Sequence, residues 1–542
     1  MMNMPDIASQ NKVLLSVQHL TVALPAGMDR EYAVEDISFD LIAGEILCII
    51  GESGSGKSVT AHAAMGLLAH ALTVRQGKII LNTQDILTLT PAAMRSLQGK
   101  TIAMIFQDPL SALNPVMSIG KQISEVLTAH TADHTLSSQD KVIALLEEVG
   151  LPEPEIIQHQ YPFNLSGGQR QRVMIAMALA LDPDVLIADE PTTALDVTTQ
   201  AQILALIRRL QHRKKMSVMF ITHDFGVVEE IADRVVVMRG GKVIEQGVTD
   251  QVLRQPTHAY TRQLIQAVPQ LEKHSRPRLS DAPVILEAIN LCKTYRKSSG
   301  LFGRSRQVIA LNNVSFTLRK GETLGVIGES GSGKSSLGKV LVKLLNADSG
   351  QILFNGHDII PVREKDFRPT RPLIQMIFQD PFASLNPRQT IGTLLSIGPR
   401  THGGMTDAEI HAKALRLLAL VGLDSGAYDR YPHEFSGGQR QRIGIARALM
   451  FDPLLLVADE SVSALDVSVQ AQVLELLAEI QQKTRVAIVF ITHDLRVASQ
   501  LCDDLLVLYR GNVVEQGTAR KLLSSPEHAY TQTLVDAIPG HH

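Results

Sequence analysis

A glycine-rich octapeptide, Gly-Glu-Ser-Gly-Ser-Gly-Lys-Ser, occurs twice in this chain of 542 residues. Apolar stretches at residues 45–50 and 322–327 precede the two copies, and each predicts a short buried strand that leads into the glycines. Three glycines let the backbone wrap closely around a polyphosphate, and a helix that follows them presents its positive end to the anion. A single match could be a chance glycine-rich turn, but two copies that both follow a strand predict two phosphate-binding loops.

Each octapeptide supplies a complete set of residues for a nucleotide phosphate. The predicted binding residues of the first copy are Gly51, Glu52, Ser53, Gly54, Ser55, Gly56, Lys57 and Ser58. Those of the second copy are Gly328, Glu329, Ser330, Gly331, Ser332, Gly333, Lys334 and Ser335. In this motif the lysine reaches the β- and γ-phosphates and the last hydroxyl holds Mg²⁺. We therefore expect Lys57 and Lys334 to contact phosphate, and Ser58 and Ser335 to ligate Mg²⁺.

The second half of the chain repeats the first well beyond the octapeptide. The same number of positions separates Glu190 from Glu460 and His223 from His493. A repeat on this scale predicts two domains of one fold. We expect the first domain over residues 12–270, a polar, proline-containing linker over 271–283, and the second domain over 284–540.

The fold class follows from uninterrupted apolar runs. They lie at residues 185–188 and 218–221, and again at 455–458 and 487–490, as in strands that are buried on both faces. The apolar residues have a mainly helical spacing from about residue 110 to 165 and from about residue 382 to 435. The prediction is an α/β protein with two tandem P-loop NTPase domains, each a mostly parallel sheet core with an inserted helical subdomain.

Composition narrows the class of function. The net charge of −3 provides no basic footprint for bulk nucleic-acid binding. The three cysteines, Cys48, Cys292 and Cys502, are far apart and have neither metal nor disulfide spacing, which agrees with a reducing cytoplasmic location. The first twelve residues lack an apolar signal core, and no apolar run is long enough to cross a bilayer. We therefore expect any membrane role to depend on partner proteins.

Two acidic pairs, Asp189-Glu190 and Asp459-Glu460, each follow a predicted buried strand. Because Mg²⁺ prefers oxygen ligands, Asp189 and Asp459 are predicted to hold it, directly or through water. Glu190 and Glu460, one residue further on, are predicted to orient or deprotonate the water that attacks the γ-phosphate. The alternative, a pair of solvated acids at a strand end, is disfavoured by the apolar strand before each pair.

A Ser-Gly-Gly-Gln stretch lies between the octapeptide and the acidic pair of each half. The residues are Ser166, Gly167, Gly168 and Gln169, and Ser436, Gly437, Gly438 and Gln439. Each stretch predicts a capping box at the start of a helix. The glycines leave backbone N–H groups open at the positive helix end, which is a second potential anion site. Since each half already has one phosphate-binding loop, this site suggests contact with a nucleotide that another domain binds.

This order of motifs resembles the ATP-binding cassette (ABC) ATPases over nearly the whole chain. The resemblance implies that Gln107 and Gln379 form Q-loops, which sense Mg²⁺ and join the core to the helical subdomain. It also implies that residues 194–196 and 464–466 are D-loops, and that His223 and His493 are switch histidines that touch the γ-phosphate. ATP and Mg²⁺ are the implied cofactors, and ATP hydrolysis is the implied reaction.

In that family two domains enclose two ATP molecules head to tail. The resemblance implies that residues 51–58, with Asp189, Glu190 and His223, face residues 436–439. In the second site, the loop of the second half likewise faces the Ser-Gly-Gly-Gln stretch of the first half. The chain would then be an intramolecular pseudo-dimer with two hydrolytic sites.

Two positions depart from this symmetry. Tyr295 stands where the family often stacks an aromatic ring on adenine, whereas the first half has Leu24 there. Either Tyr32 replaces that ring, or the first site binds adenine more weakly. Ser461 also stands where the first half has Pro191, and we attach no physical consequence to this difference.

Two further motifs resemble the oligopeptide, dipeptide and nickel importer branch of this family. One is Phe-Gln-Asp-Pro followed by Leu-Asn-Pro, at residues 106–115 and 378–387, and the other is Pro-x-His-Ala-Tyr-Thr, at 256–261 and 526–531. The second motif by itself predicts only the start of a helix, with no chemistry. No cysteine cluster follows it, so we predict no iron–sulfur site. Fused pairs of this branch resemble Yej-type peptide importer and glutathione importer subunits.

The resemblance implies an ATPase subunit that energises a membrane importer for peptides. Its implied partners are two transmembrane permease subunits and a periplasmic or lipid-anchored substrate-binding protein, with no nucleic acid. Its implied place is the cytoplasmic face of the inner membrane, as a peripheral protein.

Several alternatives stay open. One is a glutathione or nickel importer of the same branch, and another is an exporter component. A soluble tandem ABC ATPase that acts on the ribosome is disfavoured by the short linker and by the extended Q-loop motif. A non-hydrolysing nucleotide-gated module is disfavoured by the intact Glu190 and Glu460.

Overall fold

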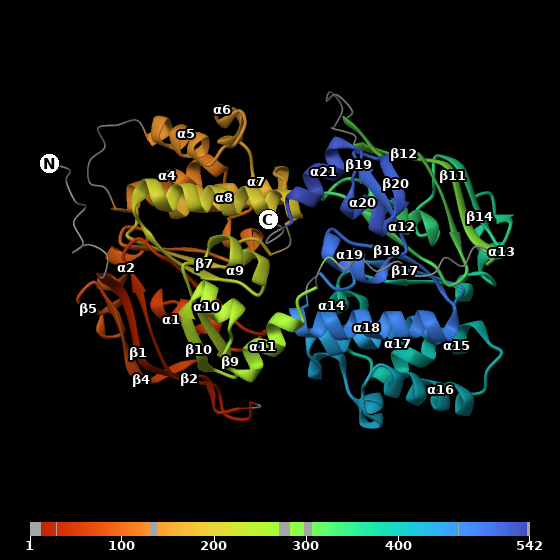
Figure 1. Cartoon of the computed structure of the whole chain (residues 1–542), viewed down its shortest axis with the longest axis horizontal. Helices are drawn as coiled ribbons and strands as arrows, with labels where there is room; N and C mark the ends of the chain where they lie inside the picture. The colour runs from red at the N-terminus through yellow and green to blue at the C-terminus, as the bar shows by residue number, and fades with distance from the viewer. Residues whose placement is uncertain are drawn as a thin grey trace. The chain divides into compact units, whose positions relative to one another are not determined.

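The computed structural model describes residues 12–28, 30–130, 138–193, 195–269, 271, 282–297, 306–463 and 465–538. The chain divides into two compact units, which we call unit 1 (mainly residues 1–267) and unit 2 (mainly residues 268–538) (Figure 1). Of the predicted linker, only residues 271, 282 and 283 are described, and Ala194 and Ala464 of the predicted D-loops lie outside the described residues.

A six-stranded sheet in the order β10-β9-β3-β8-β7-β6 forms the core of unit 1. Its strands are β3 (Ile46–Ile50), β6 (Ile102–Ile105), β7 (Val185–Asp189), β8 (Ser217–Ile221), β9 (Arg234–Arg239) and β10 (Lys242–Val248). The first five pair in parallel, and β10 joins antiparallel. Every residue of β3, β7 and β8 is buried, which confirms the predicted core of mostly parallel, doubly covered strands.

A second, antiparallel sheet of unit 1 was not part of the sequence prediction. Its order is β2-β1-β4-β5, with β1 (Val13–Ala23), β2 (Tyr32–Ile42), β4 (Thr73–Leu81) and β5 (Gln84–Asp85). Leu20 of this sheet, Ile49 of the central sheet and Ala61 of the first helix belong to one buried cluster. The antiparallel sheet therefore covers the helix that follows the first octapeptide.

The helices of unit 1 account for the predicted helical segment. They are α1 (Lys57–Ala64), α2 (Pro91–Leu97), α3 (Pro109–Ala112), α4 (Ile119–His130), α5 (Ser138–Glu148), α6 (Pro154–Ile157), α7 (Gly167–Ala178), α8 (Val197–Lys214), α9 (Phe225–Ile231), α10 (Thr249–Arg254) and α11 (Ala259–Gln266), with 3-10 turns at Ile86–Thr88 and Pro162–Asn164. Helices α3 to α6 fall within the predicted insertion, and α4 and α5 pack against α7.

Unit 2 repeats this plan with an antiparallel sheet in the order β12-β11-β14-β15 and a central sheet in the order β16-β17-β18-β13-β19-β20. The strands are β11 (Val284–Lys297), β12 (Arg306–Arg319), β13 (Thr323–Ile327), β14 (Ser349–Phe354), β15 (His357–Asp358), β16 (Ile374–Ile377), β17 (Leu455–Asp459), β18 (Ala487–Ile491), β19 (Asp504–Tyr509) and β20 (Asn512–Thr518). The helices are α12 (Lys334–Leu341), α13 (Glu364–Phe367), α14 (Pro381–Ser384), α15 (Ile391–His402), α16 (Asp407–Leu420), α17 (Gly437–Leu449), α18 (Val467–Thr484), α19 (Leu495–Leu501), α20 (Ala519–Ser524) and α21 (Ala529–Asp536), with 3-10 turns at Arg371–Leu373, Ser425–Asp429 and Pro432–Glu434.

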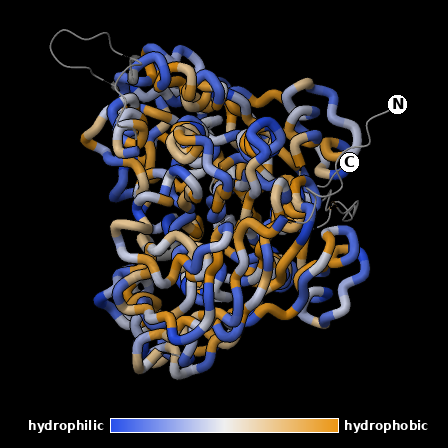
Figure 2. The backbone as a smooth tube through the Cα atoms, turned by 90° about the vertical axis from the view of Figure 1, so that its left-hand side faces the viewer, coloured by the Kyte–Doolittle hydropathy of each residue, from blue (hydrophilic) through white to orange (hydrophobic). Residues whose placement is uncertain are grey.

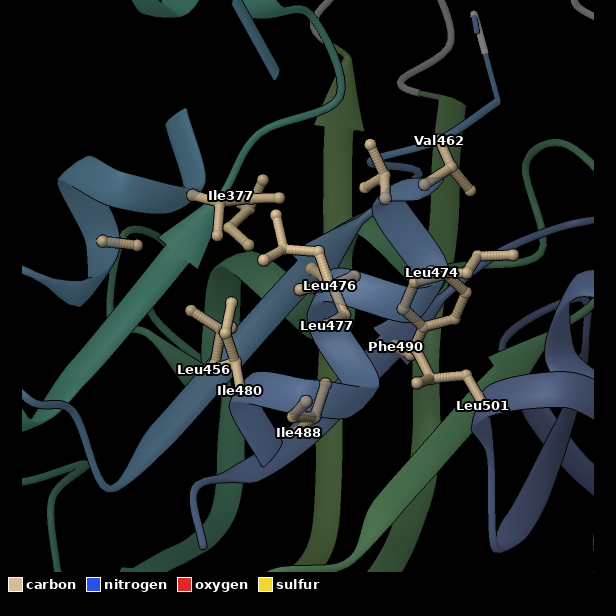
Figure 3. Close-up of a cluster of buried hydrophobic side chains, with 14 of the residues drawn as sticks. Ile377, Leu456, Val462, Leu474, Leu476, Leu477, Ile480, Ile488, Phe490 and Leu501 are labelled. Atoms are coloured by element: carbon tan, nitrogen blue, oxygen red, sulfur yellow. The ribbon is translucent and has the colours of Figure 1, made fainter. Parts of the chain in front are cut away.

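Alternate residues of the central strands in unit 2 enter two different cores. Leu456, Ile488 and Phe490 pack with Leu477 and Ile480 of α18, as Figure 3 shows. The residues between them in β17 and β18 belong to the cluster that contains α12 and the antiparallel sheet. Because strand side chains alternate between faces, this division means that both faces of the sheet are covered.

Hydrophobic and hydrophilic residues alternate over short stretches of the backbone tube (Figure 2). Among the helices of the described ranges, none has the combination of length and hydropathy that a bilayer span needs.

Candidate nucleotide sites

In each unit the octapeptide connects a central strand to a helix, β3 to α1 in unit 1 and β13 to α12 in unit 2. Gly51 and Gly328, which open the two loops, have φ of 151° and 147°. A Cβ at either position would overlap the carbonyl oxygen of Met238 or Leu508, in the strand beside the loop. Only glycine permits this close approach of two backbones, so the loop lies directly against β9 or β19.

The two loop lysines are buried and held by the loop itself. Lys57 Nζ donates to the carbonyl oxygens of Gly51 and Glu52, at 2.7 and 2.9 Å. Lys334 makes the same two bonds in unit 2, at the same distances. Burial lowers the pKa of Lys334. The carbonyl groups thus place each ammonium group against the backbone that is predicted to bind phosphate.

A serine and an aspartate meet beside each loop. The hydroxyl of Ser58 donates to Oδ1 of Asp189 at 3.0 Å, and that of Ser335 donates to Oδ1 of Asp459 at 3.0 Å. Burial raises the pKa of both aspartates, although the serine hydrogen bond acts against it. Each pair brings a hydroxyl and a carboxylate oxygen together at the end of a strand, which is a donor set that fits Mg²⁺.

Three side chains converge on the carboxylate of Glu190. Gln107 Nε2 donates to Glu190 Oε2 at 2.9 Å, and the hydroxyl of Thr193 donates to the same oxygen at 3.0 Å. His223 Nδ1 lies 3.4 Å from that oxygen. The structure therefore brings the predicted glutamate, Q-loop glutamine and switch histidine of unit 1 together, although the glutamine contacts Glu190 rather than the serine–aspartate pair.

The environment of Glu190 favours its ionised form. Burial acts to raise its pKa, but the hydrogen bond and charge of His223, with Thr193 and Lys57, lower the pKa to about 2. Glu190 also has a left-handed backbone, with φ of 45°, and Glu460 matches it at 44°. Such conformations are uncommon outside glycine and cluster at functional sites.

The carboxylate of Glu460 in unit 2 has a similar but not identical setting. Gln379 Nε2 donates to Glu460 Oε2 at 2.6 Å, and His493 Nδ1 lies 3.5 Å from Oε1. Burial acts to raise the pKa of Glu460, but the hydrogen bond and charge of His493 lower it overall. The hydroxyl of Ser463, at the position of Thr193, donates to the backbone carbonyl of Glu460 at 3.0 Å instead of to its carboxylate.

The Ser-Gly-Gly-Gln stretches form the predicted capping boxes. Gln169 N donates to Ser166 Oγ at 3.2 Å, and Ser166 N donates to Gln169 Oε1 at 2.9 Å. The box of Ser436 and Gln439 in unit 2 has distances of 3.3 and 3.0 Å. Both serines are exposed, at the starts of α7 and α17. Each unit therefore presents a solvent-facing helix N-terminus.

The predicted adenine-stacking residue lies beside the second loop. Tyr295 is 43% exposed, and its hydroxyl is 3.2 Å from Oγ of Ser336, the residue after the predicted Mg²⁺ ligand. In unit 1, Tyr32 donates its hydroxyl hydrogen bond to Glu31, at 2.6 Å.

The sequence did not predict the contacts of Thr193 with Glu190 and of Arg30 with the backbone carbonyl of Gly54. No local pattern marked either residue. Thr193 stands three positions after Glu190, which is the only hint that the sequence contains, and Arg30 reaches the first loop from the connection between β1 and β2.

The strand–loop–helix geometry and the groups around it define two P-loop nucleotide-binding units. A family model described as "ABC transporter" matches residues 34–193 and 311–463. A second model, "Oligopeptide/dipeptide transporter, C-terminal region", matches residues 244–297 and 514–542. The chain belongs to the ABC transporter ATPases, and it binds and hydrolyses ATP.

Similar proteins match the chain over nearly its full length. The peptidoglycan transport ATP-binding protein YejF of Agrobacterium fabrum is 47% identical over 529 residues, which cover 97% of this chain and 96% of that protein. The glutathione import ATP-binding protein GsiA of Salmonella typhimurium is 46% identical over 558 residues, covering 97% and 89%. A solved dimeric bacterial ABC transporter cassette aligns with 43% of this chain and 99% of its own, at 26% identity and a TM-score of 0.40.

Proposed function

We propose that this chain is the ATP-binding subunit that energises import of peptides across a membrane. The observation that carries the proposal is the repeated oligopeptide/dipeptide transporter C-terminal region, which overlaps the end of each unit at residues 244–297 and 514–542. The relatives named for peptidoglycan transport and glutathione import support it, since both molecules contain amide-linked amino acids. Glutathione is the second candidate cargo, on the strength of the second relative.

We propose the following roles within each unit. Ser58 with Asp189, and Ser335 with Asp459, hold Mg²⁺ together with the Q-loop glutamine, and Mg²⁺ neutralises phosphate charge when it is bound. Glu190 and Glu460 are ionised at neutral pH and accept a hydrogen bond from the attacking water. The histidine beside each glutamate completes the contact with the γ-phosphate.

We further propose that each ATP is shared by the loop of one domain and the Ser-Gly-Gly-Gln stretch of the other. The exposed capping boxes support this arrangement, because a helix N-terminus binds anions through its free N–H groups. The proposed domains are residues 12–270 and 284–540, and the proposed linker is 271–283. Tyr295 is the proposed adenine contact of the second site.

A groove in unit 2 is suited to a permease helix. It is a cavity of about 800 Å³ between the Q-loop and α15, lined by residues that include Phe378, Gln379 and Ile397. Phe378 and Ile397 are 37% and 51% exposed, and Leu344 on the rim is 53% exposed. Exposed apolar side chains gathered at one groove are typical of a docking site. Because Gln379 also contacts Glu460, docking here is physically connected to the hydrolytic carboxylate.

The proposed complex contains two transmembrane permease subunits and a periplasmic or lipid-anchored substrate-binding protein. This chain lies on the cytoplasmic face of the inner membrane as a peripheral subunit. It supplies energy and does not itself bind the cargo.

Affinity purification of the tagged chain from gently solubilised membranes tests this proposal. We expect two polytopic permease subunits in near-stoichiometric amounts, and we expect Ile397→Asp to release them. Val284→Asp is the control, because it places the same charge at another exposed apolar position of unit 2. Recovery of ribosomes, or of the chain without any membrane protein, would reject the importer role and leave the ATPase assignment intact.

A further inference from the structure

The two Pro-x-His-Ala-Tyr-Thr stretches begin helices, as the sequence predicts. Helix α11 begins at Ala259 and α21 at Ala529, and the preceding histidines are their N-caps. Nδ1 of His258 accepts from the backbone N–H of Tyr260 at 3.1 Å, and His528 accepts from Tyr530 in the same way at 3.1 Å. The cap thus fixes the backbone from which each tyrosine projects.

A glutamate on the last strand of each unit anchors these stretches. Glu245 of β10 accepts hydrogen bonds from the backbone N–H groups of Thr257 and His258, at 2.7 and 3.2 Å. Glu515 of β20 accepts from the residues at the same positions in unit 2, at 2.9 and 3.1 Å. The start of each terminal helix is therefore tied to the central sheet.

The tyrosine of the second stretch reaches the phosphate-binding loop. The backbone N–H of Glu329, the second residue of the loop, donates to the hydroxyl of Tyr530 at 2.9 Å. The carbonyl of Glu329 accepts the hydrogen bond from Lys334 Nζ, also at 2.9 Å. One loop residue is thus held by Tyr530 through its N–H and holds the lysine through its carbonyl.

The matching tyrosine of unit 1 occupies an equivalent place. Tyr260 is only 3% exposed, and burial, together with the carboxylate of Glu52, raises its pKa. Glu52 is the second residue of the first loop, and its carbonyl accepts from Lys57 Nζ at 2.9 Å. The hydroxyl of Tyr260 is buried without a hydrogen-bond partner among the described residues, so the bond to the loop is a feature of unit 2.

Each tyrosine ring rests on the last residue of the strand next to the loop. The guanidinium of Arg239 lies 4.5 Å from the ring centroid of Tyr260, and the ring of Tyr509 lies 4.2 Å from that of Tyr530. Arg239 and Tyr509 end β9 and β19, the strands against which the first loop glycines pack. Each ring is therefore fixed by the strand that supports the loop.

We propose that Tyr530 is a positioning residue that holds the second residue of the second phosphate-binding loop, and through it the loop lysine, ready for ATP. The terminal helix of unit 2 is thereby part of the nucleotide site. The proposal rests on the proposed role of the loops in binding ATP phosphates and does not depend on the cargo.

Titration of the full chain with MgATP tests this role at the second site. Tyr530→Phe removes only the hydroxyl, in a Lys57→Ala background that disables the first loop. Loss of one hydrogen bond predicts about three- to tenfold weaker MgATP binding. Because the loop contacts ATP before and during hydrolysis, KM should rise in the Lys57-intact chain while kcat changes little.

Tyr428→Phe is the matched control, since the hydroxyl of Tyr428 lies 3.3 Å from Ser396 Oγ in the helical part of the same unit. We expect both variants to lower the melting temperature to a similar extent and only Tyr530→Phe to weaken MgATP binding. Unchanged MgATP binding by Tyr530→Phe, with or without a change in melting temperature, overturns the proposal. Lys334→Ala in the same background tests the loop separately, because retained binding in that variant would reject the phosphate-binding role itself.

Discussion

Glu190 and Glu460, which we propose to act on the attacking water, share an unusual setting. Each is held in a left-handed backbone conformation after a buried strand and contacts a glutamine and a histidine. The units differ in one hydroxyl, because Thr193 donates to the carboxylate of Glu190 whereas Ser463 donates to a backbone carbonyl. Thr193 therefore gives the carboxylate of unit 1 a hydrogen bond that Ser463 does not give to the carboxylate of unit 2.

Replacement of both glutamates should separate ATP hydrolysis from ATP binding. Glu190→Gln with Glu460→Gln keeps the shape of the side chains but removes the charge that attracts the proton of the attacking water. Loss of this function predicts a decrease in kcat of about 10²- to 10⁴-fold, measured by phosphate release. Binding of MgATP should persist, which serves as the control, and near-normal turnover of the double variant would remove both glutamates from the mechanism.

The lowered pKa of Glu190 predicts a pH-dependent contribution to stability. The pKa falls from its ordinary value of 4.5 to about 2 in the folded chain. A carboxylate with a depressed folded pKa stabilises the fold above its unfolded pKa and loses this effect as the pH falls toward the folded value. The contribution of Glu190 should therefore be complete at neutral pH and disappear between about pH 4.5 and pH 2.

Urea unfolding of the native chain and of Glu190→Gln at several pH values measures this contribution. The variant should be less stable at pH 7, and the gap should narrow in acid. Glu229→Gln controls for the loss of a carboxylate charge, because Glu229 is exposed in the same unit. A gap that stays constant down to acidic pH would contradict the prediction.

At the scale of elements, α16 and α17 of unit 2 both begin with capping boxes. Ser436 caps α17 and Thr406 caps α16, and in both cases the side chains and backbone groups bond reciprocally. Only the Ser436 box belongs to the stretch that we propose to contact ATP. The pair allows the structural and functional parts of one motif to be separated.

Ser436→Ala and Thr406→Ala should each lower the free energy of unfolding by about 1 kcal/mol, since each removes one N-cap. Only Ser436→Ala should also reduce ATP hydrolysis. Urea unfolding and phosphate release measured on the same preparations test both statements. Equal ATPase activity in the two variants would mean that the Ser436 box is only a helix cap.

At the scale of the whole molecule, the repeat predicts which variants affect the same ATP. If each ATP is shared as proposed, Lys57 and Ser436 serve one site, and Lys334 and Ser166 serve the other. In a chain that carries Glu190→Gln and Glu460→Gln, adding Lys57→Ala with Ser436→Arg should leave one ATP bound. Adding Lys57→Ala with Ser166→Arg should leave none.

Retained ATP after gel filtration measures this pairing. The single variants Lys57→Ala and Ser436→Arg are the controls, and each should also retain one ATP. Loss of both nucleotides in Lys57→Ala with Ser436→Arg, together with one retained in Lys57→Ala with Ser166→Arg, would show that each loop works with the stretch of its own domain.

Local chemistry allowed the sequence alone to determine much of this protein. The loop glycines, the apolar central strands and the capping boxes depend on near neighbours, so the octapeptide, the mostly parallel core and the helix starts at Ser166 and Ser436 were predictable. The antiparallel sheets were not predicted, because their strands are as amphipathic as many other segments. Whether such a segment forms a strand depends on the strands that it pairs with.

Contacts between residues far apart in the sequence depend on tertiary packing. Strand order brings Ser58 to Asp189 across 131 positions, and the packing of α21 brings Tyr530 to Glu329 across 201. The stretch that contains Tyr530 predicted a helix start and nothing more. Every residue except proline has a backbone N–H, so the sequence does not show which of them Tyr530 would contact. The chain therefore specifies its nucleotide loops locally, whereas the contacts that position them depend on the packing of the last helix against the sheet.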